Sequence, residues 1–185
     1  AIVDKELYDE FVKIMKSHRV HFVNKEEKAK LENLLFGVEA NSENCGGAKL
    51  NSVIVGKPAT EIARLAGFEV PKGTVILAAE CSEVGVKEPL TREKLSPVLA
   101  VLKSTSTEDG IEKARQMVEF NGLGHTAAIH TQDEEVAEEF GKVVRACRVV
   151  WNSPSTFGGI GDVYNAFIPS LTLGCGSYGR NSVSG

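Results

Sequence analysis

Apolar residues recur at intervals of three and four along the first part of the chain, which is the spacing of amphipathic helices. This pattern predicts three helices, over residues 5–17, 25–36 and 58–65. Asp4 is expected to cap the first helix, whereas Gly37 and Gly67 follow the other two at the position where a left-handed residue ends a helix. Two short apolar stretches indicate extended segments, at residues 1–3 and 20–23.

Beyond residue 70 the pattern changes to short apolar runs that alternate with amphipathic segments. Four of the runs predict strands, at residues 74–79, 97–103, 126–130 and 148–151. Two amphipathic segments between the later strands predict helices, at residues 107–119 and 133–144. This alternation is typical of α/β proteins with right-handed crossovers. We therefore expect a single domain over residues 1–185 with an α/β fold, three αβα layers around a mostly parallel sheet.

Composition and charge argue against several classes of protein. The net charge of −4 favours neither nucleic acid nor an anionic membrane as a partner, and no apolar run is as long as a membrane span. The four cysteines are dispersed without CxxC spacing, so neither a zinc site nor a disulfide framework is expected. These features favour a cytoplasmic protein with reduced thiols and no metal ion.

Residues 174–179 (GCGSYG) match the G-x-G-x-x-G fingerprint of dinucleotide-binding folds. That fingerprint acts between a strand and a helix whose N-terminus receives a pyrophosphate. Only six residues follow Gly179, which is too few for this helix and its return strand. We therefore expect a glycine-rich loop that allows close approach of the backbone to a ligand.

Three unusual loops border the predicted strands, at residues 90–101, 121–126 and 152–161. Loops at the ends of parallel strands commonly hold ligands in α/β proteins. Each loop alone is weak evidence of a site. Their order along the chain, together with the glycine-rich segment, is more specific.

Four motifs in these segments have counterparts in one enzyme superfamily, in the same order: residues 93–98 (EKLSPV), 122–126 (GLGHT), 158–162 (GGIGD) and 169–177 (PSLTLGCGS). They resemble motifs of the C-terminal catalytic subdomain of aldehyde dehydrogenases, and above all those of the CoA-acylating branch. Within that branch the chain is similar to the aldehyde dehydrogenase half of bifunctional aldehyde-alcohol dehydrogenases. The resemblance implies a catalytic subdomain of the aldehyde dehydrogenase type over essentially the whole chain.

The resemblance also implies a reaction that uses NAD and coenzyme A. In the family a cysteine thiolate attacks a small aldehyde, the thiohemiacetal gives a hydride to NAD, and the resulting thioester passes to CoA. The family's nucleophile and nucleotide-binding domain precede the part that this chain matches, so we expect the chain alone to be inactive. The implied partners are the aldehyde, CoA, the nucleotide-binding domain and further subunits of a homo-oligomer.

Glu93 is the first candidate site residue, for catalysis and for cofactor binding. The resemblance implies that its carboxylate accepts hydrogen bonds from the nicotinamide ribose, which suits a group that only accepts. It implies also that Leu95 packs near the nicotinamide ring. Without the motif, Glu93 between Arg92 and Lys94 would indicate an ordinary solvated charge.

His125 is the second candidate catalytic residue, between Gly124 and Thr126 at the start of a predicted strand. An imidazole titrates near neutrality and could take a proton from the CoA thiol or orient the catalytic groups. The alternative is a histidine whose ring is hydrogen-bonded by the loop backbone.

The remaining candidates would line the substrate pocket: Gly158, Gly159, Gly161, Leu173, Gly174 and Cys175. A cysteine between two glycines could be a nucleophile, because backbone N–H groups activate thiolates. The family places its nucleophile elsewhere, so pocket lining is the favoured role. The other three cysteines are expected to be small buried apolar residues, namely Cys45, Cys81 and Cys147.

Two other kinds of function remain compatible with the sequence. The glycine-rich loops could belong to an autonomous α/β module that binds an acyl-CoA or a nucleotide without catalysis. The chain could also serve mainly in assembly, since the family adds a strand that pairs with a neighbouring subunit. A nucleotide-binding segment and a cysteine just upstream of Ala1 would decide for the enzyme.

Overall fold

The computed structural model describes residues 1–37, 49–121, 123–124, 126–156 and 166. The chain divides into two compact units between Lys113 and Ala114. None of the helices in these described ranges is long and apolar enough to cross a membrane.

The elements of the described part follow the α/β alternation that the sequence predicts. The strands are β1 (Ile2–Asp4), β2 (Val20–Phe22), β3 (Ile76–Cys81), β4 (Val98–Ser104), β5 (Thr126–Ile129) and β6 (Arg148–Trp151). The α-helices are α1 (Tyr8–Ser17), α2 (Lys25–Phe36), α3 (Ala59–Ala66), α4 (Thr107–Asn121) and α5 (Glu134–Val143). Two 3₁₀ helices complete the set, η2 (Ser52–Ile54) and η3 (Pro89–Thr91).

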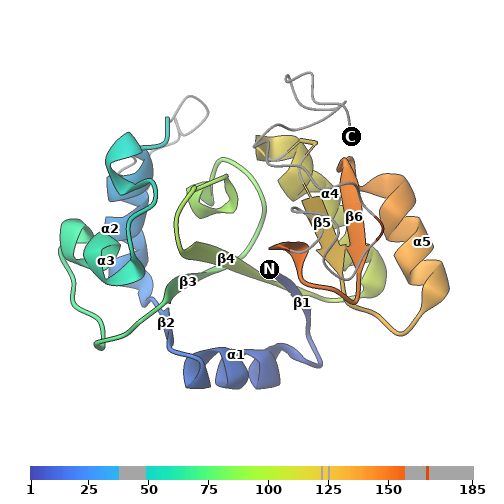
Figure 1. Cartoon of the computed structure of the whole chain (residues 1–185), viewed down its shortest axis with the longest axis horizontal. Helices are drawn as coiled ribbons and strands as arrows, with labels where there is room; N and C mark the ends of the chain where they lie inside the picture. Colours follow the sequence, from blue (N-terminus) through green and yellow to red (C-terminus); the bar gives the residue numbers. More distant parts are fainter. Residues whose placement is uncertain (38–48, 122, 125, 157–165, 167–185) are drawn as a thin grey trace. The chain divides into compact units, whose positions relative to one another are not determined.

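The first unit is built on a four-stranded sheet with the order β1-β4-β3-β2 (Figure 1). Every strand pair in it is parallel, and the register at its centre pairs Leu77 with Val98 and Cys81 with Leu102. Parallel strands need covered faces, because both faces carry apolar residues. The predicted α/β class with a parallel sheet is confirmed.

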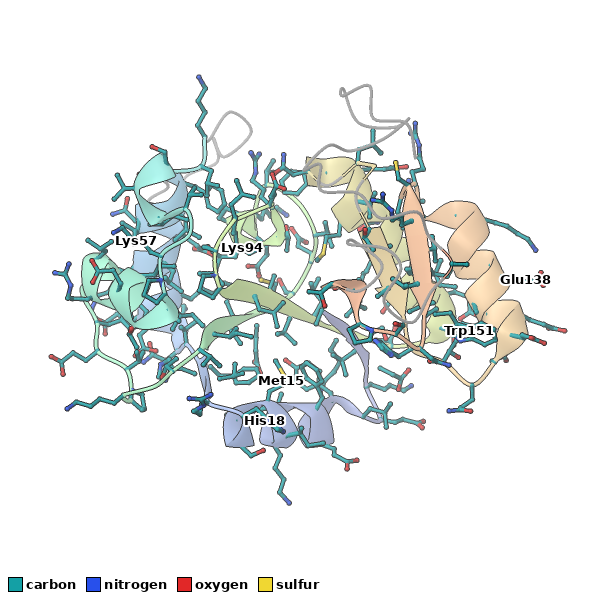
Figure 2. The ribbon with its side chains drawn as sticks, viewed as in Figure 1. Met15, His18, Lys57, Lys94, Glu138 and Trp151 are labelled. Atoms are coloured by element: carbon teal, nitrogen blue, oxygen red, sulfur yellow. The ribbon has the colours of Figure 1, made fainter. Side chains whose placement is uncertain are left out.

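Helix α1 covers one face of this sheet (Figure 1). A buried cluster joins Tyr8 of the helix to side chains of the strands, Val20, Ala78 and Val101. Met15 points from α1 toward the sheet and packs against this cluster (Figure 2). The amphipathic spacing of the sequence thus places the apolar stripe of α1 on the sheet.

The opposite face lies under the connection between β3 and β4, residues 82–97, which contains η3 (Figure 1). Side chains alternate between the two faces of a strand, so Leu77 and Ala79 face away from Ala78 and the α1 cluster. Leu90 of η3 is fully buried, and η3 contacts β3, β4 and α2. The β3–β4 connection is therefore packed against the sheet along its apolar part.

The expected capping of the first helix is wrong. The N-cap position belongs to Leu7, which makes no side-chain cap, and α1 begins at Tyr8. Asp4 is instead the last residue of β1, paired with Ser104, and its carboxylate accepts the N–H of Glu6 at 2.8 Å. Strand pairing holds Asp4 in extended backbone, so its carboxylate serves the turn after the strand.

The second helix begins and ends with strong local signals. Asn24 forms a capping box with Glu27, in which each side chain accepts a backbone N–H from the other end of the turn. Gly37 ends the helix with φ 64°, in the left-handed region that glycine adopts without strain. Both ends agree with the sequence prediction.

The second unit contains the parallel pair β5 and β6, joined by α5. Asp133 caps α5 by accepting the N–H groups of Glu135 and Val136. At the ends of the strands, the Asn152 side chain donates to the carbonyl of Thr131 at 2.8 Å and accepts its N–H at 3.0 Å. This reciprocal pair fixes the point where the loop after β6 begins.

Candidate functional site

The loop between η3 and β4 carries both described candidates, Glu93 and Leu95. The segment that leads into this loop is closed by Thr91, the last residue of η3, whose hydroxyl donates to the carbonyl of Glu88 at 2.7 Å and accepts the N–H of Gly85 at 3.2 Å. Thr91 is buried, so these bonds are shielded from water. The loop between η3 and β4 thus begins at a residue that is fixed by buried hydrogen bonds.

Lys94 lies between the two candidates and turns its side chain into the loop (Figure 2). Its ammonium donates to the carbonyls of Leu90 and Arg92, each at 2.6 Å. Burial lowers the pKa of Lys94 to about 8, against a raising influence of Cys81 and Glu93. The lysine therefore holds the loop together from within.

Glu93 and Leu95 are exposed on either side of this lysine. Leu95 is 56% exposed and has φ 46°, a left-handed conformation that is uncommon for a branched side chain. Its carbonyl accepts the N–H of Gly56 at 3.2 Å, which ties the loop to the segment after η2. An exposed leucine in a strained backbone is an outlier of the kind that clusters at functional sites.

The base of the loop contains a partly buried ion pair that the sequence does not signal. Glu88 pairs with Lys28 of α2 and accepts the N–H and the hydroxyl of Ser82, both at 3.0 Å. Lys28 also donates to the carbonyl of Glu80 at 2.9 Å. Burial by itself would raise the pKa of Glu88, but Lys28 and Ser82 outweigh it and lower that pKa. The pair anchors the loop to a helix that precedes it by 60 positions in the sequence.

The structure describes two cysteines, Cys81 and Cys147, and they differ in exposure. Cys81 is buried at the end of β3, where burial raises the pKa of its thiol to about 12. The expectation of a small buried residue is confirmed for Cys81. It is wrong for Cys147, which is exposed one residue before β6.

The predicted loop ahead of β5 is described on both sides of His125. Gly124, the second glycine of the motif, has φ 86°, a backbone conformation that residues with a side chain rarely adopt. Its N–H donates to the carbonyl of Arg145 at 3.1 Å. His125 itself lies outside the described residues.

The expected substrate-pocket residues also lie outside the described residues: Gly158, Gly159, Gly161, Leu173, Gly174 and Cys175. The same holds for Cys45. Among residues that the structure describes, no group of three or more His, Cys, Asp or Glu side chains could hold a metal ion.

Comparisons with known proteins show which enzymes the chain is similar to. The chain is 76% identical over 183 residues to the aldehyde-alcohol dehydrogenase of Streptococcus pneumoniae and 54% identical over 184 residues to aldehyde-alcohol dehydrogenase 2 of Entamoeba histolytica. The crystal structure of an acetylating aldehyde dehydrogenase from Geobacillus thermoglucosidasius matches 99% of the chain with a TM-score of 0.84 and 40% identity. No protein-family model matches the chain.

These similarities show that the chain is related to one segment of acetylating aldehyde dehydrogenases. Within that class its relatives include the bifunctional aldehyde-alcohol dehydrogenases, as the sequence motifs indicate. The chain matches 99% of its own length to the pneumococcal enzyme but spans 21% of that enzyme, and it spans 38% of the Geobacillus chain. It therefore corresponds to one segment of such an enzyme.

Proposed function

We propose that this chain is the catalytic-subdomain segment of an enzyme that converts a small aldehyde, CoA and NAD⁺ to an acyl-CoA, NADH and a proton. The 76% identity to an aldehyde-alcohol dehydrogenase across nearly the whole chain carries the proposal. The reaction balances as a two-electron oxidation: the aldehyde carbon loses a hydride to NAD⁺, and the CoA thiol loses its proton as the thioester forms.

In this proposal a cysteine outside the chain forms the covalent intermediate, and residues of the chain bind and orient the reactants. Cys81 is unsuited to nucleophilic attack, because a thiol with a pKa of about 12 holds almost no thiolate at neutral pH. The chain alone is then inactive. The exposed thiol of Cys147 lies outside the family motifs, and we assign it no part in the reaction.

Glu93 and Leu95 are proposed to meet the nicotinamide half of NAD. The observation that supports this role is their shared exposure on a loop whose base is held by Thr91 and the Glu88–Lys28 pair. A carboxylate can accept two hydroxyl donors, and an exposed leucine offers an apolar surface to an aromatic ring. His125 is proposed to take the proton of the CoA thiol, and the six pocket residues to admit the aldehyde and the acyl chain.

The experiment compares the full-length enzyme that contains this chain with its Glu93→Gln and His125→Ala variants. With acetaldehyde, CoA and NAD, we expect acetyl-CoA formation to fall at least tenfold in both variants, a loss of about 1.4 kcal/mol of transition-state stabilisation. Glu138→Gln on the exposed face of α5 is the matched control and should retain full activity. Equal activity in the Glu93 variant and the control would refute the role of Glu93.

A further inference from the structure

We propose that Lys94 is a positioning residue for NAD: its ammonium fastens the loop between η3 and β4 so that Glu93 and Leu95 face the cofactor. This inference rests on the proposed function for the identity of the ligand. The fastening itself rests on hydrogen bonds within the described loop, from Lys94 to the carbonyls of Leu90 and Arg92.

The first step concerns direction. Lys94 points into the loop, whereas its two neighbours in the sequence are exposed. Holding Lys94 inside the loop therefore leaves Glu93 and Leu95 on its exposed side.

The second step concerns the strength of the attachment. The ammonium has three donors, and two of them meet backbone carbonyls at 2.6 Å. Hydrogen bonds from a charged donor are shorter and stronger than neutral ones. The two carbonyls lie four and two residues before Lys94, so the side chain closes the turn from which Glu93 projects.

The third step concerns the strained residue that follows. A left-handed leucine persists only where its surroundings hold it. Leu95 follows directly after the turn that Lys94 closes, and its carbonyl accepts the N–H of Gly56. The burial that lowers the pKa of Lys94 agrees with a lysine enclosed by its own loop.

The test uses Lys94→Met in the full-length enzyme, since methionine keeps the length and apolar stem of lysine but removes its donors. Lys103→Met is the matched control, because Lys103 lies at the end of β4 with its ammonium over the ring of Tyr8. We expect the KM for NAD to rise at least fivefold in Lys94→Met while the KM for CoA and kcat change less than twofold. We expect also faster hydrogen exchange at amides of residues 90–97.

A KM for NAD within twofold of the unaltered enzyme, or an equal rise in both KM values, would overturn the inference. If Lys94→Met does not fold, Lys94→Gln replaces it. The glutamine side chain is shorter and uncharged, so it cannot donate charged hydrogen bonds to both carbonyls. If the unaltered enzyme forms no acetyl-CoA, the proposed function fails by itself. Hydrogen exchange and a fluorescence titration with NADH then decide the Lys94 inference, and unchanged exchange at residues 90–97 overturns it.

Discussion

At the scale of single residues, side chains of the same type differ in burial although their sequence surroundings are similar. Glu88 and Glu93 both lie in a charged stretch, yet Glu88 is buried in an ion pair and Glu93 is exposed. Cys81 and Cys147 differ in the same way. The sequence motif identifies Glu93, but the burial of Glu88 depends on Lys28, which only the fold brings near.

Thiol reactivity tests this contrast. At pH 8 a thiol with a pKa of about 12 is ionised to about one part in 10⁴, so Cys81 should resist iodoacetamide while exposed Cys147 reacts. Mass spectrometry of peptides from the native protein measures both. Denaturant should make Cys81 reactive, and equal labelling of the two residues before unfolding would contradict the structure.

At the scale of elements, residue types near a helix end predict where that helix begins or ends. The capping box at Asn24, Gly37 at the end of α2 and the cap of Asp133 on α5 all follow from residue types near each helix end. Asp4 is the exception, because pairing of β1 with β4 overrides its preference for a helix cap. Strand order and the β3–β4 connection were not predictable, since they depend on contacts between distant residues.

The ion pair at the base of the loop gives the first unit a defined response to acid. The pKa of Glu88 lies below its ordinary value of 4.5 in the folded protein, so its carboxylate stabilises the fold above that pH. This contribution is lost as the pH falls through the lowered pKa. Glu88→Gln should reduce the free energy of unfolding by about 1–3 kcal/mol at pH 7, because Lys28 loses its charged partner.

Urea denaturation at pH 7 and at pH 3.5 measures this effect. The difference between the unaltered protein and Glu88→Gln should shrink at the lower pH. Glu138→Gln, which removes one partner of the exposed pair with Lys142, should change stability by less than about 0.5 kcal/mol. A Glu88→Gln difference that does not vary with pH would show that the carboxylate charge is not the stabilising feature.

At the scale of the whole molecule, the described part of the chain supplies a parallel sheet and one exposed loop, and the chain spans 21% of its pneumococcal relative. The motifs in the sequence suffice to indicate the similarity to aldehyde-alcohol dehydrogenases, because they keep their order along the whole chain. They say less about how the loop is held: Lys94 resembles any surface lysine in the sequence, and its buried position follows from the fold. His125 and the pocket residues remain predictions from the motifs.

The most direct test of the central claim is the fate of the acyl group. The full-length enzyme that contains this chain is incubated with acetaldehyde, NAD and CoA, and acetyl-CoA, acetate and NADH are quantified by chromatography and absorbance. We predict one acetyl-CoA for each NADH, with little acetate, because the thioester passes to CoA. NADH formation with acetate as the product, or no NADH at all from the folded enzyme, would contradict the account.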